Sequence, residues 1–395
     1  MRRRAAGARV MTSIALLVLG GACVDLDSLL VPADAGGGDD GLSGDGGAPG
    51  LDATIDHVSG DGPSSDAPGE AKSDGSQLEA SAEAATDAAA DTGGPVVPWW
   101  NSAYSSREKI TITNAATTDL LAGFQVGWHV DVQALATKSG SFDEVRLVRW
   151  DTASSSWTEL TRVIDDFGAG QQWIWVRLAA TITAGSADGG YYLYFGNGSP
   201  PTAPNDPATV FDFYDAFSES TLGSSWQNMG GYTLTGSELG LSTNQHVHST
   251  QTWGPGHAVD FVLRDPVYAG RYWAGLQLAN TFNDDPPWAV WIARNQPSPA
   301  TIWPELTLDN VTLWAGAAQA LGTAATMYGV DWLGDMALYR EADAVLFSHA
   351  PTSPYSTPLC ARLTNESADT VYFSDLRVRQ AVYPTPTVAT GPVEH

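Results

Sequence analysis

The feature that most constrains the fold of this chain is an abrupt change of composition at residues 95–100, PVVPWW. None of the fifteen tryptophans lies before this segment. Beyond it, apolar and polar residues alternate with a period of two, as at Ile110 and Ile112, and Gly, Asn, Asp or Pro interrupts the alternation every few residues. Such alternation places every second side chain on the same face of a strand, and frequent turns favour antiparallel pairing. The fold class predicted for residues 97–384 is all-β, with two antiparallel, jelly-roll-like β-sandwich domains.

The segment before this change predicts a disordered tether. Residues 24–96 contain sixteen Asp or Glu and one Lys, are rich in Gly, Ala, Ser and Pro, and show no apolar periodicity. Such a segment cannot bury enough apolar surface to offset the entropy of ordering the chain. The net charge of −26 for the whole chain repels phosphate backbones, so nucleic acid is excluded as an expected partner.

The first 23 residues have the three parts of an export signal. Several arginines precede an apolar stretch at 10–19 that is too short to span a bilayer, and Gly20-Gly21-Ala22 then precedes Cys23. The junction resembles a bacterial lipobox, in which lipid is attached to the cysteine and the preceding peptide is removed. It departs from the usual pattern at Gly20, where an aliphatic residue normally stands. We expect a lipidated Cys23 that anchors the protein to the cell envelope, at the outer membrane. Plain secretion and a buried first helix are the alternatives.

The first β block resembles a known bacterial family in three short motifs. These are WNSAY at 100–104 with the strand ITI that follows, WIWV at 173–176, and a Tyr-rich strand ending in Gly-Asn, YLYFGN, at 192–197. On these residues the block, about 99–205, resembles the family known as domain of unknown function 2341. The resemblance implies a β-sandwich. It implies no activity, because none is established for the family.

The second β block, about 209–383, opens with VFDFYDAF at 210–217 and closes with VYFSDLRVR at 371–379. This opening and ending resemble those of concanavalin A-like, laminin-G-like jelly rolls. The resemblance implies that the first and last strands of the block pair with each other. It also implies a lectin-like surface. The motif NDP at 205–207 is the expected boundary between the two blocks.

Hydrolysis is the sharpest enzymatic hypothesis, because some concanavalin-like folds are glycosidases. Their retaining mechanism uses paired carboxylates about 5 Å apart, in the pattern Glu-x-Asp-x-x-Glu on one strand. The nearest match runs from Glu341 through Asp343 to Leu346, and Leu346 cannot transfer a proton. The same residues have the features of a turn between two strands. The sequence therefore predicts a hairpin tip here and no catalytic residue.

Two sets of residues are candidate metal ligands. His246 and His248 share one face of a predicted strand and can chelate zinc or copper with a third ligand, for which His257 is the nearest candidate. Surface histidines on an edge strand are the alternative. Asp284 and Asp285 offer the hard oxygen ligands that calcium prefers, as such loops do in laminin-G-like relatives. An ordinary proline-stiffened loop is the alternative there, and no other cofactor is expected.

Tryptophans crowd the middle of the second block, and the candidate ligand-binding residues are Trp253, Trp273, Trp288 and Trp291. Most tryptophans of a sandwich lie in its core, because each ring buries a large apolar area. Turn residues beside Trp253, Trp288 and Trp291 nevertheless favour exposed rings, which stack on the apolar faces of sugars. Cys360 lies in an apolar strand and is expected to be a buried small hydrophobe.

The complete prediction divides the chain into five parts. Residues 1–22 are a lipoprotein signal peptide, 23–96 the lipidated cysteine and its linker, 97–206 and 207–384 the two sandwiches, and 385–395 a flexible C-terminal tail. The expected function is that of a non-catalytic, envelope-anchored, lectin-like protein that binds glycan or a protein surface. The alternatives are an envelope glycosidase with an unrecognised site and a structural or adhesive spacer.

Overall fold

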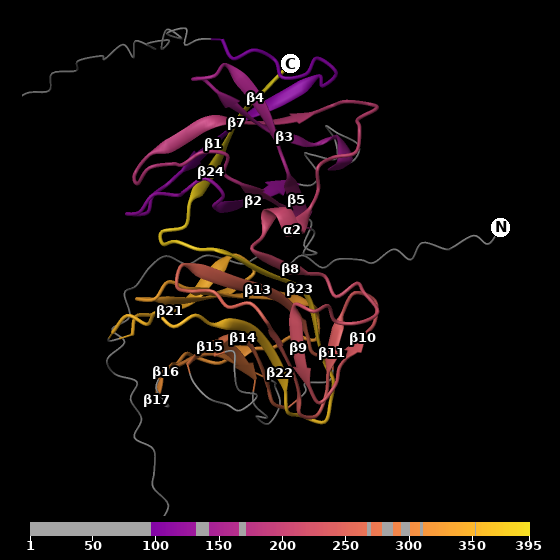
Figure 1. Cartoon of the computed structure of the whole chain (residues 1–395), viewed down its shortest axis with the longest axis vertical. Helices are drawn as coiled ribbons and strands as arrows, with labels where there is room; N and C mark the ends of the chain where they lie inside the picture. The colour runs from indigo at the N-terminus through magenta and orange to yellow at the C-terminus, as the bar shows by residue number, and fades with distance from the viewer. Residues whose placement is uncertain are drawn as a thin grey trace, which may run out of the picture. The chain divides into compact units, whose positions relative to one another are not determined.

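A computed structural model describes most of the chain from Val96 to its C-terminus (Figure 1). The described residues are 96–131, 142–165, 171–266, 270–278, 287–293, 301–308, 311–351 and 353–395. The predicted export signal and tether, Cys23, and the pair Asp284 and Asp285 lie outside them. Regular structure in the described residues is antiparallel strand, apart from the helix α2 (Pro207–Val210) and the 3-10 helix η2 (Phe142–Glu144). This confirms the all-β prediction.

The first sandwich takes its strands from both ends of the described chain. They are β1 (Ser106–Thr113), β2 (Gln125–Asp131), β3 (Arg146–Asp151), β4 (Ser156–Leu160), β5 (Arg162–Asp165), β6 (Gln171–Arg177), β7 (Ala187–Phe195) and β24 (Thr387–Glu394). Among the described residues these form a five-stranded sheet in the order β24-β1-β7-β3-β4 and a three-stranded sheet in the order β2-β6-β5. Ile110 and Ile112 of the larger sheet share one buried core with Ile174 and Val176 of the smaller sheet. The alternation in the sequence therefore defines the buried face.

The C-terminal residues correct the prediction of a flexible tail over 385–395. Residues 387–394 form β24, which pairs antiparallel with β1 and places Thr390 opposite Ile110 (Figure 1, yellow). The edge of β1 presents backbone N–H and C=O groups that need partners. A weakly apolar segment such as TVATGPVE can satisfy them through its backbone, without an apolar pattern of its own. The second sandwich is thus inserted between β7 and β24 of the first.

The second sandwich contains two sheets, each of eight strands within the described residues. The β13 sheet has the order β10-β11-β23-β13-β19-β20-β21, with β8 paired to β23. The β14 sheet has the order β17-β16-β15-β14-β22-β12-β9, with β18 paired to β16. The strands are β8 (Phe213–Asp215), β9 (Trp226–Met229), β10 (Thr233–Leu234), β11 (Leu239–Leu241), β12 (Gln245–Ser249), β13 (His257–Arg264), β14 (Tyr272–Gln277), β15 (Trp288–Ala293), β16 (Thr301–Leu308), β17 (Val311–Ala315), β18 (Gln319–Ala320), β19 (Thr326–Trp332), β20 (Ala337–Glu341), β21 (Ala344–His349), β22 (Cys360–Asn365) and β23 (Val371–Gln380).

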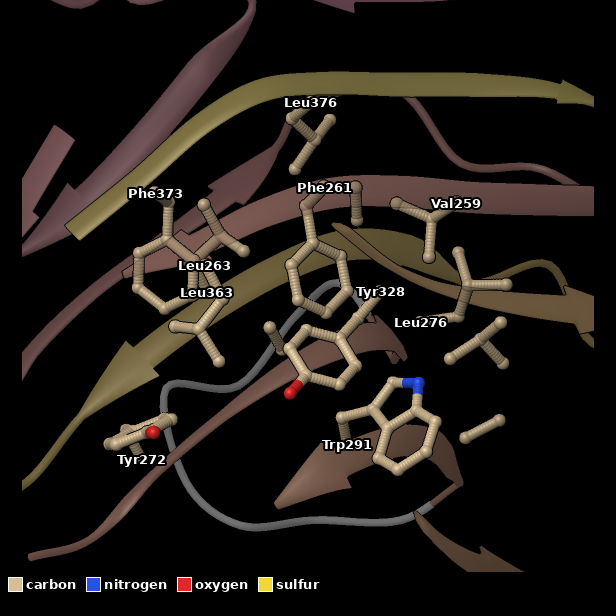
Figure 2. Close-up of a cluster of buried hydrophobic side chains, with 14 of the residues drawn as sticks. Val259, Phe261, Leu263, Tyr272, Leu276, Trp291, Tyr328, Leu363, Phe373 and Leu376 are labelled. Atoms are coloured by element: carbon tan, nitrogen blue, oxygen red, sulfur yellow. The ribbon is translucent and has the colours of Figure 1, made fainter. Parts of the chain in front are cut away.

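The core of the second sandwich lies between these sheets. Figure 2 shows Phe261 and Tyr328 of the β13 sheet together with Trp291, Leu276 and Leu363 of the β14 sheet. The ring centroids of Trp291 and Tyr328 are 5.1 Å apart. Close ring contacts of this kind add to the apolar area that each side chain buries. The core therefore holds the two sheets against each other, and the opposite faces of the sheets are fixed with them.

The opening and ending of the second block pair as expected. Strand β8 lies antiparallel to β23, with Tyr214 opposite Arg377. Just before it, Asp206 caps α2 by accepting a hydrogen bond from the backbone N–H of Ala208 (3.1 Å), and Pro207 occupies the first helical turn. Both residues are typical of helix starts. The capped helix is where the chain passes from the first sandwich to the second.

Candidate functional site

The β14 sheet has one face in the core and one face turned away from it. Its core face includes Ala274 of β14 and Trp291 of β15. Residues of the opposite parity form a second apolar cluster, made of Trp273, Val290, Ile292, Trp288 and Trp303. Successive side chains of a strand point to opposite faces, so both sets follow from the pleat. We call the face that carries the second cluster the outer face.

The outer face is hollowed where β14, β15 and β16 run side by side. A cavity of about 100 Å³ lies there, with walls that include Trp273, Gln277, Trp288 and Glu305. By its register, Gly275 stands on this face between Trp273 and Gln277. A Cβ atom on it would lie 2.4 Å from the backbone oxygen of Ala289. Glycine in a strand interior commonly marks such a close approach of backbone. Because Gly275 has no side chain, the face stays open between Trp273 and Gln277. We call the cavity of about 100 Å³ the tryptophan hollow.

Two buried polar side chains orient the tryptophan rings of the hollow. The indole Nε1 of Trp288 donates to Oε1 of Glu305 at 3.1 Å, and Oγ1 of Thr307 donates to the same oxygen at 3.2 Å. The indole Nε1 of Trp273 donates to Oε1 of Gln277 at 3.3 Å. Glu305 is only 3% exposed and Gln277 is fully buried. Hydrogen bonds to buried partners hold both rings in fixed planes.

Arg271 and Glu366 form an ion pair at the rim of the hollow. The guanidinium carbon of Arg271 lies 5.6 Å from the ring centroid of Trp273. Its Nη1 lies 2.9 Å from Oε2 of Glu366. The arginine is therefore both a cation beside an aromatic ring and one half of an ion pair.

The outer face continues as a polar row across β22 and β12. Nδ1 of His246 lies 3.3 Å from Oγ1 of Thr364 and 3.4 Å from Nη2 of Arg362. Burial, together with the neighbouring Arg362, lowers the pKa of His246 to about 4. The imidazole is therefore neutral at neutral pH.

His246 and His248 share this face, as the sequence predicted, but they are not surface histidines of an edge strand. They are 5% and 4% exposed, and β12 lies between β22 and β9. His257 lies on β13 in the other sheet, where its Nδ1 is 2.9 Å from the backbone oxygen of Gly254. Within the part of the chain that the structure describes, no group of three His, Cys, Asp or Glu is placed to hold a metal ion. The zinc hypothesis thus gains no third ligand there.

The structure brings together two of the four candidate tryptophans, Trp273 and Trp288. The expectation of exposed rings is corrected for Trp253 and Trp291, which are 5% and 0% exposed and belong to the core between the sheets. Trp273 is also only 5% exposed, but its ring lies on the outer face. The indole Nε1 of Trp291 donates to the backbone oxygen of Gly329 at 3.0 Å. The strand period explains the difference within β15. Residues 288 and 291 are three positions apart and so face opposite sides of the sheet, whatever turn precedes them.

Of the other predicted residues, the structure describes Cys360 but not Cys23, Asp284 or Asp285. Cys360 is buried as expected, and burial raises the pKa of its thiol to about 12. Asp284 and Asp285 fall outside the described residues, as does Cys23, so calcium binding and lipidation stay predictions. No helix within the described ranges is long and apolar enough to cross a membrane.

The Glu341–Asp343 segment is a hairpin tip, as predicted. It joins β20 to β21 through Ala342, whose φ of 53° is left-handed. Glu305, a buried carboxylate that lines the hollow, was not predicted from the sequence. Its signal is the alternation in WPELT at 303–307, which places Glu305 on the same face as a tryptophan and a threonine.

Comparison with known proteins finds one family. The family described as Domain of unknown function (DUF2341) matches residues 141–229. The match therefore begins inside the first sandwich and ends with β9 of the second. No curated protein matches the chain.

Solved structures similar to this chain include three bacterial enzymes. A laminarinase from Flavobacterium sp. UMI-01 is 12% identical over 43% of this chain and 100% of its own, with a TM-score of 0.35. A β-glucanase from Bacillus licheniformis is 14% identical over 43% of this chain and 97% of its own, with a TM-score of 0.32. A β-1,3-glucanase from Mycobacterium marinum is 14% identical over 42% of this chain and 98% of its own, with a TM-score of 0.33.

Proposed function

We propose that the second sandwich binds carbohydrate in the tryptophan hollow and does not cleave it. The observation that carries this proposal is a pair of indole rings, Trp273 and Trp288, held in place by the buried acceptors Gln277 and Glu305. A sugar ring has an apolar face of C–H groups and an edge of hydroxyls. An aromatic wall beside a few fixed polar groups offers a partner to each.

The charges around the hollow favour a neutral glycan. Arg271 is paired with Glu366 at the rim, and the hollow itself contains the carboxylate Glu305. His246, on the polar row nearby, is neutral at neutral pH because its pKa is lowered to about 4 by burial and by Arg362. The chain as a whole carries a net charge of −26, which repels acidic polysaccharides.

The arrangement of Glu305 supports binding rather than hydrolysis. A retaining glycosidase needs two carboxyl groups about 5–5.5 Å apart. Glu305 is the one carboxylate among the described residues that line the hollow, and it accepts hydrogen bonds from Trp288 and Thr307. An envelope glycosidase remains the second candidate, and Glu305 is then its first candidate residue because it is buried beside the aromatic wall.

The proposal is tested by titrating the purified full-length chain with soluble neutral polysaccharides and oligosaccharides in a calorimeter. We expect Trp288→Ala to weaken binding at least tenfold, which corresponds to about 1.4 kcal/mol. Trp150→Ala is the matched control, because Trp150 is a half-buried tryptophan of the first sandwich, and its affinity should equal that of the wild type.

Two results would count against this function. Equal affinities of wild type and Trp288→Ala would remove the hollow as the binding site. Shortened oligosaccharides in the wild-type mixture, absent with Glu305→Gln, would establish a glycosidase instead. Chromatography of the titrated mixtures detects them.

We further propose that the protein is exported and held at the outer membrane by lipid on Cys23. The support is the sequence alone: a basic and apolar start, small residues before Cys23, and an acidic segment at 24–96 that suits a long tether. Growth with a labelled fatty acid should label the wild type and leave Cys23→Ala unlabelled. Label in both, or in neither, would contradict the proposal.

A further inference from the structure

A second cavity lies at the junction of the two sandwiches. Its volume is about 450 Å³. It is lined by strands β2, β6 and β24 of the first sandwich, by β19, β20, β21 and β23 of the second, and by residues of the 381–386 segment that joins them. Cavities that bind small ligands are commonly about 300–1,000 Å³ and are frequent at domain interfaces. We call this space the junction cavity.

The first wall of the junction cavity is aromatic. Trp173 and Trp175 of β6 are stacked, with ring centroids 5.4 Å apart and planes 21° apart. His129 of β2 lies 4.0 Å from Trp173 by centroid. A Cβ atom on Gly127 would lie 2.5 Å from the ring of Trp175, so only glycine lets this ring lie against β2. The rings of His129, Trp173 and Trp175 therefore form one aromatic surface, and Gly127 leaves the space that the ring of Trp175 occupies.

The second wall is charged but internally neutralised. Arg377 and Arg379 each donate through Nε to Oδ2 of Asp260, at 3.1 and 3.0 Å. Arg340 donates through Nε to Oδ1 of Asp331 at 3.0 Å and also pairs with Asp260. Burial alone would raise the pKa of Asp260, but the three guanidinium groups hold it well below its ordinary value. The arginines are thus already matched by carboxylates, and the wall offers polar groups with little surplus charge.

The two walls are held together by contacts between the sandwiches. Arg377 pairs with Asp165 of β5, and its guanidinium carbon lies 4.5 Å from the ring centroid of Trp175. The backbone N–H of Gln380 donates to Oε1 of Gln125 at 2.8 Å. These contacts fix the width of the cavity.

Each wall has a polar atom without a hydrogen-bond partner among the described residues. The indole nitrogen of Trp175 is buried and has no hydrogen-bond partner among the described residues, although the ring is only 6% exposed. The hydrogen bonds of Arg340 within the described residues use its Nε and Nη2 atoms and leave Nη1 unused. A buried donor without an acceptor costs about 1–3 kcal/mol, so a ligand oxygen that accepts from it is favoured.

We propose that the junction cavity is a second carbohydrate site, one that takes a neutral sugar ring of a glycan. Trp173 supplies the aromatic face, and Trp175 and Arg340 supply N–H donors to hydroxyl oxygens. An anion is disfavoured because each arginine of the wall has a carboxylate partner. The site is independent of the tryptophan hollow, since it uses different strands and different tryptophans.

The test blocks the cavity from a position that does not support the core. Val345 lines the cavity and is 46% exposed, whereas its neighbour Leu346 is 38% exposed and is not part of the lining. Full-length wild type, Val345→Trp and Leu346→Trp are titrated with glucose, galactose, mannose, N-acetylglucosamine and their disaccharides at millimolar concentration. We expect at least one sugar to bind with an affinity that falls at least tenfold in Val345→Trp and is unchanged in Leu346→Trp.

Further variants separate this site from the proposed one. Trp173→Ala should reduce the same binding at least tenfold, whereas Trp150→Ala, at a half-buried tryptophan outside the lining, should leave it unchanged. If only Trp288→Ala weakens sugar binding, the hollow stands and the junction site falls. The proposal is also overturned if no sugar of the panel binds, if Val345→Trp binds as the wild type does, or if glucuronate binds more tightly than glucose.

Discussion

Arg107 and Glu394 lie at opposite ends of the described chain and form an ion pair, with Nε and Oε2 separated by 2.7 Å. The pair sits on β1 and β24, which face each other along the edge of the larger sheet of the first sandwich. The first sandwich therefore includes residues on both sides of the second in the sequence. A fragment that ends before β24 lacks one of its strands.

Deletion of residues 387–395 should destabilise the first sandwich. The deletion removes the backbone hydrogen bonds between β24 and β1 and the contact of Val388 with the core. We expect the free energy of unfolding to fall by about 2–4 kcal/mol, measured by urea denaturation. Glu394→Gln is the control. It removes the charge of Glu394, whose side chain is 44% exposed, and leaves Arg107 its hydrogen bonds to Tyr194 and Val97, so it should cost less than about 1 kcal/mol. If the urea midpoint of the deletion variant equals that of the wild type, residues 387–395 do not stabilise the first sandwich and the prediction is wrong.

Trp291→Ala and Trp288→Ala should differ sharply in stability, although both residues lie on β15. Trp291 is fully buried, so its loss should lower the free energy of unfolding by about 3–5 kcal/mol. Trp288 lies on the outer face, and its removal should cost about 1–2 kcal/mol and act mainly on ligand binding. Thermal unfolding of both variants measures the difference. Equal losses would contradict the assignment of their faces.

Gly275→Ala should be poorly tolerated. The new Cβ atom would lie 2.4 Å from the backbone oxygen of Ala289. Overpacking of this kind costs about 1–3 kcal/mol, and movement of β15 would also narrow the hollow. Gly198→Ala is a matched control, because nothing lies within 4 Å of its Cβ position. It should change stability by no more than about 0.5 kcal/mol. Comparable melting temperatures for the two variants would refute the close contact.

Stability should fall on acidification through the range in which His246 titrates. Burial and Arg362 lower its pKa from 6.5 to about 4 in the folded protein. Between these values the unfolded chain binds a proton that the folded chain does not, so the folded state loses stability as the pH falls and is unaffected above this range. The expected contribution is about 1–3 kcal/mol. Urea midpoints from pH 7 to 4 should show a shallower decline for His246→Gln. Parallel declines would exclude His246 as a source.

The sequence predicts much of the strand pattern but little of what the strands bury. Ile110 and Ile112 mark the core face of β1 by alternation alone. The resemblance carried by the motifs at 210–217 and 371–379 implied that β8 and β23 pair, and they do. Alternation cannot say which of two aromatic faces becomes the core. Trp288 and Trp291 are both tryptophans beside turn residues, and only the position of the second sheet separates their roles.

Other features depend on contacts between distant segments, which a single sequence does not reveal. The edge of β1 recruits β24 through backbone groups, so its weak pattern carries no signal. Arg377 meets Asp165 from the other sandwich, across 212 positions of sequence. Neither residue differs locally from an ordinary solvent-facing charge on a strand.

The chain enters the second sandwich on β8 and leaves it on β23, and these strands are neighbours, with the N–H of Asp212 bonded to the backbone oxygen of Val378 at 2.9 Å. Because its entry and exit strands lie side by side, the second sandwich joins the first at a single place. Insertions of this kind are tolerated where the ends of the inserted unit lie close together. The second sandwich can therefore be exchanged for another fold whose ends are equally close, while the strands of the first sandwich stay intact.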